Sequence, residues 1–201
     1  MLTKISPEEF YDKFALDYDD LLKNPNSKAQ YINEAVKIFH RHHHHSGNVL
    51  DIACGTGALS ELLQGDFEYT GIDISAKMLD YAAQRGYQTI HKPIETALAE
   101  IDTHSYDFVF CLSSLLCVED AATAIKHMKR IARKTILVSL DETTEEYIKN
   151  VVVPVYDHSK ISIEDAIEDY FILGWTSPTL GISIRTRMIY IEKCSEPTDL
   201  L

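Results

Sequence analysis

The chain lacks long apolar runs and has few cysteines. No segment reaches the ~18 apolar residues that a membrane-spanning helix requires, and residues 1–9 contain no apolar core of a signal peptide. The cysteines Cys54, Cys111, Cys117 and Cys194 form no CxxC pair, which argues against a disulfide framework or a structural zinc. We therefore expect a cytoplasmic protein with reduced thiols and no membrane anchor.

Positively charged residues are also few. The chain has 19 Lys and Arg against 31 Asp and Glu, which gives a net charge of −12. Binding to a nucleic-acid backbone needs clustered Lys and Arg, so no nucleic-acid partner is expected. The run His40–His45 holds five of the nine histidines, with no acidic residue or cysteine close to it in sequence. We interpret this run as the solvated end of a helix and assign no metal site, although metal binding is the alternative.

The apolar pattern predicts two N-terminal helices followed by alternating strands and helices in one domain of 201 residues. The first helix begins with the capping box Ser6-Pro7-Glu8-Glu9, and the second runs to about His42. Repeated β-α units of this length predict a parallel sheet with helices on both faces. The expected strands lie near 48–53, 68–73, 88–91, 106–112 and 135–140, and the expected helices near 57–64, 75–86 and 120–132.

The last third of the chain has a different pattern. A charged helix is expected over 142–149, and a further helix is expected to begin at Ser162 and end before Gly174. Residues 181–193 alternate between apolar and polar and predict one long strand, with 175–180 as its antiparallel neighbour.

The most informative segment runs from Asp51 to Gly57, where an apolar strand ends in a loop of small residues before a helix. The next strand ends in Asp73, 20 positions after Ala53. A nucleoside cofactor bound across a parallel sheet needs this arrangement, because the loop lets backbone approach and the carboxylate binds ribose hydroxyls. The third glycine of the dinucleotide pattern is absent, since Ala58-Leu59-Ser60 follows Gly57, and this argues against NAD.

Four segments carry recognisable motifs: Asp51–Gly57, Gly71–Ser75 followed by Met78-Leu79, Tyr106–Leu112 and Tyr11–Asp19. They resemble motifs of the Rossmann-like (class I) S-adenosylmethionine-dependent methyltransferases of the small-molecule type. Together they cover about residues 8–140. The terminal strand pair is similar to that family's usual sheet ending, and the resemblance implies a doubly wound, mostly parallel seven-stranded α/β sheet with a terminal antiparallel strand in three layers.

The resemblance implies a role for the loop and for the acidic residue one strand away. Ala53, Gly55 and Gly57 would line the loop under the methionine part of the cofactor, although the family often has Gly in place of Ala53. Asp51 would anchor the loop, and Asp73 would accept both ribose hydroxyls in a charge-assisted contact.

The resemblance also implies the apolar contacts of the cofactor. Ile74 and Met78 would enclose the adenine, and Leu112 would lie beside the sulfonium. Ile94 or Glu95 would meet the adenine edge, although this chain has Lys92-Pro93-Ile94-Glu95 where the family commonly has an acidic residue after a Gly. For Met78, packing in the core is the alternative role.

Residues 1–46 would form an N-terminal helical lid over a core of residues 47–201. Tyr11 and Tyr18 would close over the cofactor, with simple packing as the alternative for both. Cys54 is expected to be an inert side chain of the loop rather than a reactive thiol.

The expected reaction transfers a methyl group in line to a small-molecule acceptor, a reaction that mainly requires alignment and exclusion of water. The motif Asn-Pro-Pro-Tyr of nucleic-acid amine methyltransferases is absent, and Ser113-Ser114 stands after the strand 106–112. A general base is expected from His158 with Asp157, and Asp141 is a second candidate.

Two other functions remain open at this point. One is a protein that binds S-adenosylmethionine or its product S-adenosylhomocysteine without catalysis, as a regulatory subunit. The other is a nucleotide- or NAD-dependent enzyme on a similar sheet. We expect a monomer or a homodimer.

Overall fold

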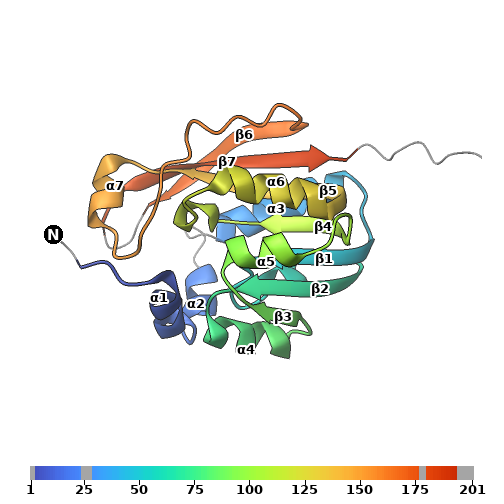
Figure 1. Ribbon diagram of the computed structural model, residues 1–201, viewed down its shortest axis with the longest axis horizontal. Helices are drawn as coiled ribbons and strands as arrows, with labels where there is room; N and C mark the ends of the chain where they lie inside the picture. The colour runs from blue at the N-terminus through green and yellow to red at the C-terminus, as the bar shows by residue number, and fades with distance from the viewer. Residues whose placement is uncertain (1–2, 24–28, 177–179, 194–201) are drawn as a thin grey trace, which may run out of the picture.

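The computed structural model describes residues 3–23, 29–176 and 180–193, and its centre is a seven-stranded sheet (Figure 1). The strand order is β3-β2-β1-β4-β5-β7-β6, with β7 antiparallel to both β5 and β6 and the other neighbouring pairs parallel. This confirms the predicted fold class. The strands are β1 Ser46–Ile52, β2 Asp66–Asp73, β3 Gln88–His91, β4 Tyr106–Cys111, β5 Ala132–Glu142, β6 Glu168–Thr176 and β7 Ser183–Glu192.

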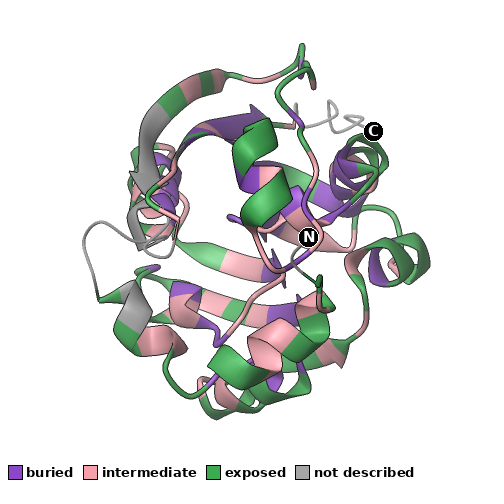
Figure 2. Ribbon diagram, turned by 90° about the vertical axis from the view of Figure 1, so that its left-hand side faces the viewer, coloured by how far each residue is buried: buried purple, intermediate pink, exposed green. Residues whose placement is uncertain are grey.

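Alternation along the buried strands divides the core between the two faces of the sheet. Val49 and Phe108 pack toward α3 (Ala29–Arg41), whereas Leu50 and Val109 pack on the opposite face. Helices α5 (Ile94–Glu100) and α6 (Ala121–Ile131) cover that opposite face. The outer turns of the helices are exposed and the buried residues lie between the layers (Figure 2). The sheet is therefore enclosed on both sides, which accounts for the apolar character of its central strands.

The first two helices lie at one end of the sheet, beside α4 (Ala76–Gln84) (Figure 1). Helix α1 (Pro7–Phe14) begins as predicted, with the Ser6 hydroxyl accepting from the Glu9 amide at 3.1 Å. Helix α2 covers Tyr18–Leu22. Of the predicted lid 1–46, α1 and α2 are thus placed apart from α3, which packs on the sheet, and the boundary at residue 46 stays a prediction.

Two predicted helices are wrong. The segment 57–64 contains only one 3₁₀ turn, η1 (Ala58–Glu61), because Gly57 has a left-handed conformation and β2 begins already at Asp66. The helix expected between Ser162 and Gly174 is replaced by β6, whose backbone pairs with β7. Local capping signals at Ser162 were outweighed by this long-range pairing. Of the predicted neighbour strand 175–180, Trp175 and Thr176 belong to β6, and 177–179 lie outside the described residues.

The remaining elements are short. Helix α7 covers Glu145–Asn150, and a second 3₁₀ turn, η2 (Leu115–Cys117), follows β4. None of the helices formed by the described residues combines the length and apolar character needed to cross a bilayer.

Candidate functional site

A cavity lies at the carboxyl ends of β1, β2 and β4. The chain proceeds from β1 outward to β2 and β3 and then returns to β4 on the other side, so the strand order reverses between β1 and β4. Such a reversal leaves a crevice outside the carboxyl ends of the strands. The cavity is lined by Pro7, Tyr11, Tyr18, Ala53, Gly55, Asp73, Ile74, Met78, Pro93, Ile94, Glu95, Ser113, Ser114, Cys117 and Val118.

Most of the cofactor-binding residues predicted from the sequence line this cavity, and three do not. Asp51 and Leu112 line a smaller neighbouring cavity, together with Tyr18 and Ala53. Gly57 lines neither cavity. It is buried against α4 and Tyr87, since a Cβ added at Gly57 would lie 2.9 Å from the Tyr87 ring and 3.1 Å from Ala82 Cα. The structure therefore brings together residues from both N-terminal helices and from the ends of the central strands.

The loop after β1 takes an unusual backbone path. Ala53 and Gly55 both have positive φ, 53° and 54°, and for Ala53 this is a sparsely populated conformation. The Cys54 amide donates to the Ile72 carbonyl at 3.0 Å, which holds the loop against β2. The turn therefore presents small side chains and backbone to the cavity.

Asp73 connects this loop to the start of α4. One carboxylate oxygen accepts from the Gly55 amide at 2.9 Å, and the other accepts from the Ser75 amide at 2.8 Å. Burial raises the pKa of the Asp73 carboxyl, while the Ser75 and Gly55 amides oppose that rise. Each oxygen keeps lone pairs for a further donor, and Asp73 lines the cavity, so the carboxylate can accept two hydroxyl groups there.

Asp51 lies behind the loop, almost completely buried. The Tyr87 hydroxyl donates to its carboxylate at 2.9 Å. Burial raises the pKa of Asp51 to about 7, with the neighbouring charge of Asp73 adding to the rise. Asp51 can therefore change its protonation state near neutral pH.

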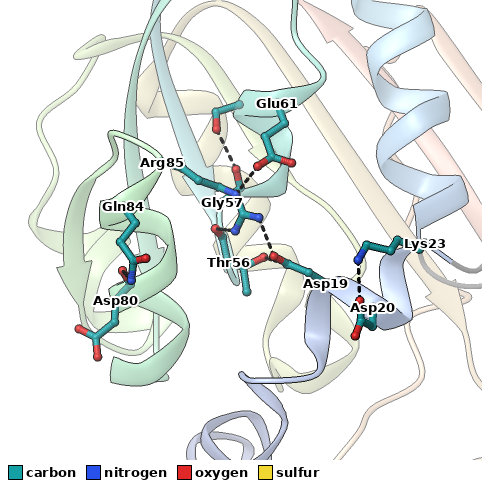
Figure 3. A network of polar contacts seen from close by, with 10 residues as sticks. Asp19, Asp20, Lys23, Thr56, Gly57, Glu61, Asp80, Gln84 and Arg85 are labelled. Carbon is teal, nitrogen blue, oxygen red and sulfur yellow. Dashed lines mark hydrogen bonds and ion pairs between the residues drawn. The ribbon is translucent and has the colours of Figure 1, made fainter.

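Two carboxylates of the N-terminal helices attach to the edges of the cavity. Asp12 of α1 accepts from the Ser75 hydroxyl at 2.5 Å, and Ser75 also caps α4. Asp19 of α2 accepts from the Thr56 hydroxyl at 2.6 Å and from Arg85 at 2.5 Å (Figure 3). Both attachments are made to segments that also contact or flank Asp73 and Gly55.

The tyrosines of these helices face the cavity. Tyr18 lies against the loop, since a Cβ added at Gly55 would be 3.4 Å from the Tyr18 ring. Burial raises the pKa of the Tyr11 phenol well above its ordinary value, with Cys117 and Asp73 adding to the effect. Tyr11 therefore remains a neutral phenol that can donate or accept a hydrogen bond.

The segment after β4 contributes four cavity residues that the sequence interpretation missed, Ser113, Ser114, Cys117 and Val118. Ser113, like Ala53, has a positive φ, of 58°. The carboxyl-end rule that identified Ala53 and Asp73 applies equally to β4 and could have extended the prediction beyond Leu112.

The two predicted catalytic residues do not line the described cavities. The His158 imidazole is buried, and its Nε2 lies 3.0 Å from the Leu115 carbonyl and 2.9 Å from the Val118 carbonyl. Asp157 is exposed and accepts from the amide and hydroxyl of Ser159 at 3.0 and 2.9 Å. A catalytic role for either residue stays a prediction, and the geometry of His158 favours a structural one.

Burial raises the pKa of the Cys54 thiol, with Asp51 adding to the rise, so the thiol stays protonated. Among the residues that the structure describes, no three His, Cys, Asp or Glu side chains form a group able to hold a metal ion.

Known proteins similar to this chain include methyltransferases. Residues 50–138, a little under half of the chain, match the family described as methyltransferase domain. A ubiquinone biosynthesis O-methyltransferase of Nitrosospira multiformis is 30% identical over 121 residues, which are 55% of this chain and 51% of the relative. The chain thus spans about half the length of that relative.

Solved structures show the same fold over nearly the whole chain. Magnesium protoporphyrin IX methyltransferase (ChlM) from Synechocystis PCC 6803, with bound S-adenosylhomocysteine, has a TM-score of 0.62 at 17% identity. The alignment covers 92% of this chain and 97% of ChlM. The [4+2]-cyclase SpnF has a TM-score of 0.68 at 12% identity, covering 96% and 97% of the two chains. The fold alone therefore does not decide the reaction.

Proposed function

We propose that this chain is an S-adenosylmethionine-dependent methyltransferase that acts on a small molecule. The observation that carries the proposal is Asp73, a buried carboxylate held beside the Gly55 amide at the carboxyl end of β2. It has unused lone pairs at the cavity, as two ribose hydroxyls require. The methyltransferase-domain match over residues 50–138 supports the same function.

The residues present fit the methyl donor. Small side chains and positive φ at Ala53 and Gly55 leave room for it beside the loop, and Ile74 and Met78 offer apolar surface for the adenine. When bound, S-adenosylmethionine supplies an activated methyl group on a sulfonium. The chain supplies binding, orientation and exclusion of water, which are the main requirements of an in-line displacement.

Acceptor binding would fall to cavity residues outside the loop. Ser113, Ser114 and Cys117 of the segment after β4 line the cavity together with Tyr11 and Pro7 of α1. Because the Tyr11 phenol stays neutral, we assign it hydrogen bonding to the acceptor rather than base catalysis. The relative from Nitrosospira multiformis is a ubiquinone biosynthesis O-methyltransferase, which favours a small hydroxyl-bearing acceptor for this chain too.

Calorimetry with S-adenosylhomocysteine tests the role of Asp73. We expect the wild type to bind and Asp73→Asn to bind roughly 10- to 100-fold more weakly, because a hydrogen bond to a charged group contributes about 1.5–3 kcal/mol. Asp66→Asn, an exposed position at the other end of β2, is the matched control. Equal affinity of the two variants would contradict the assignment.

A protein that binds the same ligand without transferring its methyl group is the second candidate, since the [4+2]-cyclase SpnF shows that this fold is not confined to methyltransferases. Transfer of labelled methyl groups from S-adenosylmethionine to components of a metabolite extract separates the two. Binding of S-adenosylhomocysteine without any transfer would favour this second candidate.

A further inference from the structure

Three residues form a closed ring of polar contacts between α2, the loop after β1 and the end of α4 (Figure 3). The Thr56 hydroxyl donates to one oxygen of Asp19 at 2.6 Å. Arg85 donates to the other oxygen of Asp19 at 2.5 Å and to the Thr56 carbonyl at 2.7 Å. Each of the three residues therefore contacts both of the others.

The position of Arg85 makes this ring rigid. Its side chain is only 19% exposed, and its Nε also donates to Glu61 of η1 at 2.7 Å. The guanidinium thus bonds with a fixed geometry to three separate segments, which a flexible ammonium would match less well. Although burial acts in the opposite direction, the hydrogen bonds from Thr56 and Arg85 hold the pKa of Asp19 below its ordinary value.

The ring lies directly behind the proposed cofactor site. Thr56 separates Gly55, which lines the cavity, from Gly57, which packs on α4. Asp19 follows Tyr18, whose ring contacts the loop at Gly55 and lines both cavities. A shift of Asp19 would therefore move Tyr18 relative to Gly55, and a shift of Thr56 would move the loop itself.

The surroundings of α2 show why this contact matters for its position. Leu16, Asp17 and Asp20 are exposed, and Asp20 pairs with Lys23 within the same segment. Asp19, in contrast, is bonded to Thr56 of the loop after β1 and to Arg85 at the end of α4. The docking of Tyr18 on the loop is thus linked to the charges of Asp19 and Arg85.

We propose that Asp19 and Arg85 are positioning residues that couple the binding of S-adenosylmethionine at the Ala53–Gly57 loop to the docking of α2, so that breaking their contact speeds release of the bound cofactor. This inference rests on the function proposed above. By linkage, a bound ligand that contacts both Tyr18 and the loop stabilises the ring, and the intact ring stabilises the bound ligand to the same extent.

The test compares two neighbouring carboxylates on one helix. Asp19→Asn removes the charge inside the ring, and Asp20→Asn removes the same charge from an exposed pair with Lys23. We expect S-adenosylhomocysteine to bind roughly 10-fold more weakly to Asp19→Asn, within the usual range of coupling between sites, with the change mainly in the dissociation rate. Asp20→Asn should bind like the wild type, within about twofold.

Melting without ligand shows whether Asp19→Asn remains folded. If it does not, Arg85→Lys keeps the charge but loses the fork that reaches Asp19 and Thr56 together, and it should also speed release. Equal dissociation rates for the wild type and the folded ring variants would overturn the coupling. Failure of the wild type itself to bind S-adenosylhomocysteine would instead overturn the proposed function.

Discussion

At the scale of single residues, His158 shows how the surroundings of a side chain restrict its chemistry. A carbonyl oxygen only accepts hydrogen bonds, so the Nε2 that lies near the carbonyls of Leu115 and Val118 must carry a proton. That nitrogen cannot remove a proton from a substrate while these contacts persist. His158 instead links the segment after β5 to η2, whose last residue Cys117 lines the cavity together with the following Val118.

We expect His158→Gln to lower the free energy of unfolding by roughly 1–3 kcal/mol, because two buried carbonyls lose a well-placed donor. The pH dependence of methyl transfer should keep its shape. Urea unfolding and rate measurements between pH 5 and 9 check both statements. A general base at His158 would instead show as the loss of a titration step from the pH–rate profile.

At the scale of structural elements, the loop after β1 is held in place by close packing on α4. Gly57 has a φ of 78°, and an added Cβ would lie 3.1 Å from the Ala82 backbone. Gly86, just beyond the same helix, has a φ of 89°, but an added Cβ would meet nothing within 4 Å. The two glycines therefore share a backbone requirement and differ in packing.

We expect Gly57→Ala to destabilise the protein by roughly 2–4 kcal/mol and Gly86→Ala by only about 1 kcal/mol, the cost of the left-handed conformation alone. Denaturant unfolding of both variants measures the difference. Similar values would mean that α4 and Tyr87 move aside at little cost. Binding of S-adenosylhomocysteine should weaken only in Gly57→Ala, since only that loop borders the proposed site.

At the scale of the whole molecule, folding buries acidic groups whose protonation then depends on the fold. The Asp51 carboxyl has a pKa of about 7 in the folded protein instead of 3.8. At pH values between 3.8 and about 7, Asp51 keeps a proton in the folded protein that it has released in the unfolded chain. The contribution of Asp51 to stability is therefore fully present below pH 3.8 and is lost progressively as the pH rises to about 7.

Asp51→Asn removes this titration and leaves an oxygen to accept from Tyr87. We expect the stability of this variant relative to the wild type to increase by roughly 2–4 kcal/mol between pH 4 and 8. Comparison of the two proteins cancels the opposite contributions of carboxylates with lowered pKa values, such as Asp19 and Asp107. Parallel stability curves over this range would show that Asp51 ionises normally in the folded state.

Several features of the candidate site could be predicted from local sequence patterns. The loop 51–57 and Asp73 follow strands with clear apolar signals, and parallel strands place their carboxyl ends at one edge. Spacing along the chain does not tell which glycine borders a cavity and which packs on a helix, and Gly57 packs on α4. The role of Arg85 had no local signal, since its partners Asp19 and Thr56 lie far from it in sequence.

The sequence by itself determined the parallel sheet with helices on both faces and the identity of the loop and its carboxylate, because hydrophobic period and turn chemistry act over short stretches. Only the tertiary structure decided that the segment after Ser162 continues into a strand rather than a helix, since β6 depends on hydrogen bonds to β7. Only the tertiary structure placed His158 against carbonyls and Asp19 against Arg85. Such contacts join residues distant in sequence, and their energies depend on burial that no local pattern specifies.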